Sequence, residues 1–160
     1  MIRRADVLLG AILVGLTVAS APASSAGCWQ WDGTGSVTLQ DSRASGAYLL
    51  LDSNMESDRL EPYLTFPAFA LCQHDDDTAY QVRPLGIGQV NGQPVHFAYH
   101  CMGGQDLELM GESPRDVAVI IEAISAQQSI DIQVGIHQFH GISCNGREAL
   151  TVASQRIDSE

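Results

Sequence analysis

The stretch AYQVRPLGIGQVNGQPVHFAYHC, residues 79–101, carries the clearest structural signal in the chain. Asn91-Gly92 separates two runs of alternating side chains, and this pair is preferred in tight hairpin turns because both residues adopt positive φ. In the second run Phe97, Tyr99 and Cys101 share one strand face, which we expect to contact the core. The stretch therefore predicts an antiparallel hairpin within a β-rich protein.

Short apolar runs separated by turn residues come before this hairpin. Residues 37–39 and 47–51 are typical of short strands, and residues 53–61 are typical of a polar loop. Residues 63–72 are apolar on both faces and predict a buried strand, in which Pro67 favours an edge position or a bulge. The first half of the chain therefore predicts further strands.

The pattern changes to helical spacing at about residues 114–127. Ser113 suits the N-cap, Pro114 suits the first helical position, and Asp116 stands where a capping box has its acidic residue. The apolar residues of this segment form one stripe: Val117, Ile120, Ile121 and Ile124. We therefore expect one α-helix here.

Two more segments follow this helix. Residues 130–136 alternate between apolar and polar side chains, as a half-buried strand does. Residues 147–157 fit either a strand after a turn at Asn145-Gly146 or a helix capped by Asn145, and we favour the strand. The whole pattern predicts a mainly β fold, a β-sandwich or a partly open OB-like barrel, with one α-helix inserted late, about residues 114–127.

Residues 1–26 have the layout of a cleaved secretory signal peptide. A basic pair precedes an apolar run, residues 7–18, and small residues follow, so that cleavage after Ala23 and cleavage after Ala26 both fit. The run is too short to cross about 30 Å of hydrocarbon, which argues against a transmembrane anchor. Cys28 allows a lipoprotein alternative, although Ser25 stands where a lipobox has a large aliphatic residue.

Residues 27–160 then form a single domain that is periplasmic or secreted, with no membrane span. This segment contains six Arg, no Lys and 18 acidic residues, a net charge of −12. Such a charge repels nucleic acids and anionic lipids. It favours a basic protein partner, a cation, or simply solubility in a salt-rich medium.

The four cysteines, Cys28, Cys72, Cys101 and Cys144, predict two disulfides because thiols oxidise in exported proteins. None of them has the Cys-x-x-Cys spacing of redox and zinc motifs. Of the three possible pairings, chain order and strand faces favour Cys28–Cys72 and Cys101–Cys144. In this hypothesis the strand after the helix returns beside the hairpin and brings Cys144 to Cys101.

His96, His100, His137 and His140 are candidate ligands for copper or zinc. His96 and His100 share a strand face but lie about 13 Å apart, so one ion would also need His137 or His140. Ordinary hydrogen-bonded surface histidines are the alternative. The acidic run at residues 74–77 lacks the alternating carboxylates and the glycine of a calcium loop, and is typical of a solvated loop.

Trp29 and Trp31 alternate with Gln30 and are candidate binding residues, and anchoring of the first strand in the core is the alternative. We find no nucleophile elbow and no phosphate-binding loop, so we expect no catalytic residues and no cofactor. The leading hypothesis is an exported acidic binding module that recognises another protein, as inhibitors and immunity proteins do. A periplasmic copper- or zinc-binding protein is the second hypothesis, and a small secreted hydrolase is the third.

Overall fold

The computed structural model describes residues 28–31, 36–43, 45–54, 59–67, 72, 81–102, 106–126 and 128–155. The predicted signal peptide and the acidic run at residues 74–77 lie outside these residues. The described strands are β1 (Gln30–Trp31), β2 (Val37–Gln40), β3 (Tyr48–Asn54), β4 (Arg59–Phe66), β5 (Arg83–Val90), β6 (Gln93–Cys101), β7 (Leu107–Gly111), β8 (Ser129–Val134) and β9 (His137–Ile142). The described helices are α1 (Pro114–Ser125) and α2 (Gly146–Gln155).

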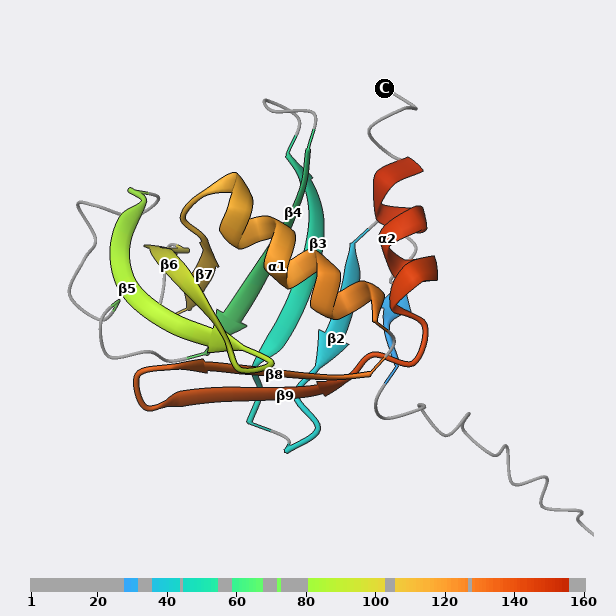
Figure 1. The fold of residues 1–160 in the computed structure, drawn as a ribbon, viewed down its shortest axis with the longest axis horizontal. Coiled ribbons are helices and arrows are strands. Elements are labelled where there is room, and N and C mark those ends of the chain that lie inside the picture. The colour runs from blue at the N-terminus through green and yellow to red at the C-terminus, as the bar shows by residue number, and fades with distance from the viewer. Residues whose placement is uncertain are drawn as a thin grey trace, which may run out of the picture.

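The described strands form one antiparallel sheet in the order β1-β2-β3-β4-β7-β6-β5-β8-β9. The sheet curls into a half-barrel, α1 lies across its concave side, and α2 stands beside β2 and β3 (Figure 1). The predicted mainly β fold with a late helix is confirmed. No helix in the described ranges has the length and apolar character needed to span a membrane.

The core lies between the concave face of the sheet and α1. Its largest fully buried side chains come from both halves of the chain: Leu39, Leu49, Leu51, Leu64, Val90, Phe97, Leu107, Leu109, Ile124, Ile130, Ile132 and Phe139. Most of them are Leu, Ile or Val, which are among the residue types most often buried in proteins. The half-barrel is therefore held by one continuous apolar cluster.

The hairpin at Asn91-Gly92 forms as predicted. Asn91 has a φ of 49° and Gly92 a φ of 79°, the positive values that the turn requires. Phe97 and Cys101 are buried in the core, which confirms the predicted face of β6. A β-bulge between Pro84 and Gly86 bends β5, so the hairpin curves with the sheet.

Helix α1 also begins as predicted. The Ser113 hydroxyl accepts a hydrogen bond from the Asp116 backbone N–H, and the helix ends at Ser125, two residues before the predicted end. Only part of the predicted stripe is fully buried in the core. Val117 and Ile121 are half-buried at the side of the helix.

The predicted loop at residues 53–61 is too long and the predicted strand at residues 63–72 begins too late. β3 and β4 form one long hairpin in which Asn54 pairs with Arg59. Residues 53–61 resemble a loop in sequence because most of them are polar, which hides the alternation typical of a strand. Pro67 lies one residue past the end of β4.

The C-terminal segment is a helix, so the strand favoured for residues 147–157 is wrong. Ala149 and Ala153 lie one turn apart and are buried, which is helical rather than strand spacing. A side chain at Gly146 would bring its Cβ within 1.9 Å of the Ile124 carbonyl oxygen, so α2 begins in direct contact with the end of α1. Small residues thus let α2 pack closely against its neighbours. The local sequence pattern alone does not decide between a strand and a helix for this segment.

The predicted disulfide pairing is wrong. The structure contains these two disulfides: Cys28–Cys144 and Cys72–Cys101, with Cα–Cα distances of 5.3 Å and 5.5 Å. The position of Leu107 explains the Cys72–Cys101 disulfide. Leu107 belongs to β7, which is the strand between β4 and β6. Leu107 pairs with Phe66 on one side and with Cys101 on the other, and Cys72 follows Phe66 closely in the chain.

The pairing prediction fails because β8, the strand after α1, returns to a different part of the sheet from the one expected. β8 pairs with β5 at Val90, beside the hairpin turn, and this is the opposite end of β6 from Cys101. Cys144 is instead close to the first described residues, because Asn145 Oδ1 accepts a hydrogen bond of 2.9 Å from the Trp29 backbone N–H. The N-terminal segment is therefore tied to the turn between β9 and α2.

Asp41 brings the two sides of the sheet together. The His140 backbone N–H of β9 donates to Asp41 Oδ1 at 3.2 Å, and the Ser42 N–H donates to the His140 carbonyl at 2.8 Å. Nearby, a Cβ at Gly141 would lie 2.5 Å from Leu39, so β9 and β2 pack without space between them. These contacts link the β2–β3 turn to the last strand and narrow the open side of the half-barrel.

Candidate functional site

An open groove of about 700 Å³ lies between α1 and the outer part of β4. It forms because β7 ends at Gly111 and the chain turns into α1, whereas β4 continues outward as far as Arg59. A Cβ at Gly111 would lie 2.7 Å from the Val117 backbone nitrogen, so this turn is packed directly against the helix. The volume is in the usual range for ligand sites, roughly 300–1,000 Å³.

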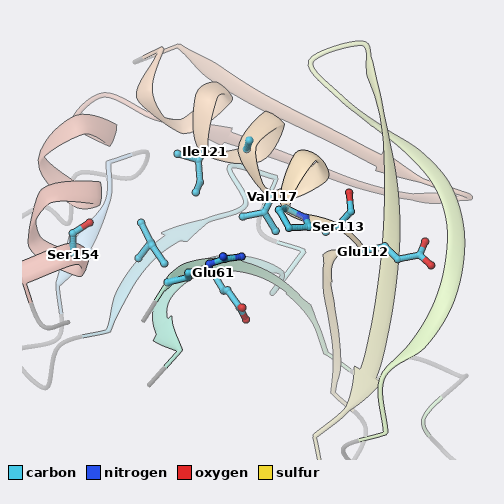
Figure 2. Close-up of a pocket in the computed structure, with 11 residues that line it drawn as sticks. Glu61, Glu112, Ser113, Val117, Ile121 and Ser154 are labelled. Carbon is cyan, nitrogen blue, oxygen red and sulfur yellow. The ribbon is translucent and has the colours of Figure 1, made fainter. Parts of the chain in front are cut away.

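The side of the groove formed by the helix is apolar. Figure 2 shows Val117 and Ile121 pointing from α1 toward β4, with Ser154 of α2 at one end of the groove. Leu60 of β4 also lines the groove, and all three apolar side chains are half-buried. Glu112 lies at the other end, and Glu61 of β4 lies between the two ends (Figure 2), so the helix side of the groove is apolar and the strand side carries Arg59 and Glu61.

The strand side of the groove is an open sheet edge. β4 pairs with β7 only over Leu64–Phe66, and no described strand pairs with that edge from Arg59 to Tyr63. Pro62 is tolerated within β4 for this reason, since proline is found in strands with an open edge. Unpaired strand edges are templates for another strand. The groove therefore combines an apolar helix face with a strand edge.

The beginning of α1 is locked to β6 beside the groove. The buried Asp116 carboxylate accepts hydrogen bonds from the Ser113 hydroxyl and, at 2.9 Å, from the His96 backbone N–H. Burial alone would raise the pKa of Asp116, but these hydrogen bonds and the nearby His96 ring hold the pKa below its usual value. The ionised carboxylate thus fixes the helix that forms the apolar side of the groove.

His100 belongs to a polar cluster that extends along β4 to Glu61, one of the residues that line the groove. Its Nε2 lies 2.7 Å from Glu108 Oε2, and its ring is stacked on Tyr63 at a centroid distance of 6.4 Å. The Tyr63 hydroxyl donates to Glu61 at 2.5 Å. Burial and this hydrogen bond raise the pKa of Tyr63 above its ordinary value. Each polar side chain of the cluster therefore has a partner within the cluster.

The four candidate histidines have separate neighbours. His96 lies beside Asp116, His100 beside Glu108, His137 against the Phe66 ring and His140 beside Asp131: these pairs come from four different places in the fold. Burial lowers the pKa of His137. Among the described residues, no three His, Cys, Asp or Glu side chains gather as a metal site would require.

The two tryptophans differ in exposure. Trp29 is only 6% exposed, and its indole N–H donates to the Ser143 hydroxyl at 2.8 Å. Ser143 in turn donates to the Ile124 carbonyl, so Trp29 anchors the N-terminal segment to the end of α1. Trp31 is 63% exposed and remains available for contact.

The sequence pattern does not predict the groove. An apolar stripe on a helix normally faces the core, so the stripe that contains Val117 and Ile121 predicts core residues. The one signal was the width of that stripe, which has more apolar positions than α1 buries. The open edge of β4 has no local signal, since it depends on where β7 ends.

The chain matches no known protein family, no curated protein and no solved structure.

Proposed function

We propose that the protein is an exported binding module that takes an extended segment of another protein into the groove between α1 and β4. The observation that carries this proposal is the open edge of β4 beside the apolar face of α1. A segment added to this edge would receive main-chain hydrogen bonds from β4. Every second side chain would then face Val117 and Ile121, which supplies selectivity for apolar residues.

The charge of this protein indicates which other residues the partner carries. The predicted mature segment carries a net charge of −12 and no Lys, and the groove is lined by two acidic residues, Glu61 and Glu112, and one basic residue, Arg59. A partner with basic residues beside its apolar ones would be attracted at long range and would associate faster at low salt. An inhibitor or immunity-type role fits such a partner, because it requires binding without catalysis.

The test is photo-crosslinking from inside the groove. Ala118 is exposed and lines the groove, whereas Thr151 is exposed on α2 outside it. A photoreactive residue at position 118 should trap a protein from a periplasmic extract of the host at low salt, and the same residue at position 151 should not. Trapping should weaken at high salt because the attraction is screened.

A variant that blocks the groove tests the location of the binding site separately from the proposed binding function. Ala118→Arg should reduce retention of the partner at least tenfold, while the charge-matched Thr151→Arg should leave it unchanged. Retention that is unaffected by Ala118→Arg would move the site away from the groove. If no protein is retained at low salt by the unmodified chain, the proposed function itself fails.

We also infer that the chain is exported after removal of residues 1–26. The paired cysteines suit an oxidising compartment, and the N-terminal sequence has the features of a signal peptide. The mature product purified from the periplasm should begin at Gly27 and contain no free thiol. A full-length product that stays in the cytosol would contradict export.

A further inference from the structure

Three glutamines form a row across neighbouring strands on the outer face of the sheet. Gln89 of β5 pairs with Gln133 of β8, and Gln133 pairs with Gln138 of β9. All three are exposed, while the residues beside them in each strand, such as Ile132 and Phe139, are buried. The row is therefore set by strand alternation and register, at about 4.8 Å between strands.

The row lines a small polar cavity. The cavity has a volume of about 210 Å³ and is also lined by Arg43 and Asp131. Arg43 Nη1 donates to Gln138 Oε1 at 3.2 Å, which fixes the orientation of that amide. The amides of Gln89 and Gln133 take part in no described side-chain hydrogen bond, so their donors and acceptors face solvent.

The charged groups around this cavity are already paired within the protein. Arg43 Nε lies 3.2 Å from the buried Asp41 carboxylate, and Asp131 Oδ1 lies 2.5 Å from His140 Nδ1. The site therefore offers no unpaired charge to an ionic ligand, and the net acidity of the chain disfavours anions. What remains is a row of neutral amides, each with two donors and one acceptor oxygen.

We propose that this amide row, Gln89, Gln133 and Gln138 with Arg43 and Asp131, is a binding site for a neutral saccharide. Hydroxyl groups of a sugar ring both donate and accept, and they match planar amides that present both functions. The cavity holds a unit the size of one ring, and neighbouring amides lie about one strand spacing apart. This site is separate from the groove, because it lies on β5, β8 and β9.

The probes are cellotetraose, chitotetraose and maltotetraose, added separately to the ¹⁵N-labelled protein. At least one should shift the backbone resonances of the three glutamines and of Asp131 in a saturable manner, and leave Ala118 in the groove unchanged. Gln133→Ala should weaken that binding about three- to tenfold, the effect of one or two lost hydrogen bonds.

Gln93→Ala is the matched control, because Gln93 is an exposed glutamine on the neighbouring strand β6 outside the cavity. It should leave the affinity unchanged. The proposal is overturned if none of the three oligosaccharides shifts these resonances, or if Gln133→Ala and Gln93→Ala bind the sugar equally well. Shifts confined to the groove residues would also overturn it.

Discussion

Two aspartates are buried among the described residues, Asp41 and Asp116, and they use the same chemistry in different places. Each accepts a hydrogen bond from a nearby serine hydroxyl, Ser45 for Asp41 and Ser113 for Asp116. Each also accepts from the backbone N–H of a histidine on another strand. A buried carboxylate is stable only when donors satisfy it, and both sites provide them.

The difference between the two sites is the distance along the chain. Asp116 lies 20 residues from His96, in the first turn of α1 beside the N-cap Ser113, whereas Asp41 lies 99 residues from His140 and joins the β2–β3 turn to the last strand. A cap organises one element, while a link between distant strands holds the half-barrel together. We therefore expect Asp41 to matter more for the stability of the whole domain, and Asp116 more for the position of α1.

Replacing Asp41 should give the largest effect. Asp41→Ala leaves the backbone N–H groups of Arg43 and His140 without their acceptor at a site that is 5% exposed. The free energy of unfolding should fall by about 2–4 kcal/mol, measured by urea denaturation. Asp106→Ala, at an exposed aspartate, is the control and should change stability by less than about 0.5 kcal/mol. Equal losses in the two variants would contradict the role of Asp41 as a link.

Replacing Asp116 should cost less. Asp116→Ala removes the acceptor for the His96 N–H, but the Ser113 hydroxyl still accepts from the helix. We expect a loss of about 1–2 kcal/mol, in the range of other helix caps.

A double-mutant cycle sharpens this prediction. Because Ser113 and Asp116 contact each other, the double Ala variant should lose less stability than the sum of the single variants. Strict additivity would mean that the two side chains act separately.

The same contrast explains what the sequence could predict. The Ser113 cap beside Asp116 and the turn at Asn91-Gly92 involve neighbouring residues, so a local pattern identifies them. The sequence around Asp41 is rich in turn residues and gives no sign of its partner, because His140 of β9 is distant in the chain. Alternation continues through Ile136, so β8 was predicted to run past the hairpin turn that Gly135 forms with a φ of 60°.

The disulfide pairing and the candidate site could not be predicted from the sequence for a related reason. The cysteine count predicted two bridges correctly, but the pairing depends on which strand lies between which others. Val117 was recognised as apolar, but its position at the side of a groove depends on where β7 ends. Composition and local spacing do not contain strand order, so these features required the structure.

Lowering the pH should reduce the stability that Asp41 and Asp116 contribute. This loss tests whether the two carboxylates are ionised in the folded protein. Burial alone would raise the pKa of Asp41, but hydrogen bonds from Ser45, Arg43 and His140 outweigh it and hold the pKa below its usual value. The pKa of Asp116 is lowered as well. A lowered folded-state pKa adds stability that is present above the unfolded pKa, and this stability is lost as the pH falls through the folded value.

The measurement is the free energy of unfolding as the pH falls below about 4. The parent protein should lose stability steeply in this range, and Asp41→Asn and Asp116→Asn should each lose less, because one titrating group is gone. Asp106→Asn should follow the parent curve. A curve for Asp41→Asn parallel to that of the parent would mean that this carboxylate has an ordinary pKa.

The smallest effect should come from the two histidine rings, since the backbone of each histidine makes the contact with the aspartate. The His96 ring is 57% exposed and lies 3.6 Å from Asp116, and the His140 ring pairs with Asp131, which is itself 60% exposed. Exposed ion pairs contribute about 0–1 kcal/mol, so His96→Ala and His140→Ala should each change stability by roughly 0.5 kcal/mol or less. His140→Pro removes the N–H that reaches Asp41 and should approach the loss seen for Asp41→Ala. If His140→Ala alone were as damaging as Asp41→Ala, the ring rather than the backbone would hold the last strand, and the parallel between the two aspartates would break down.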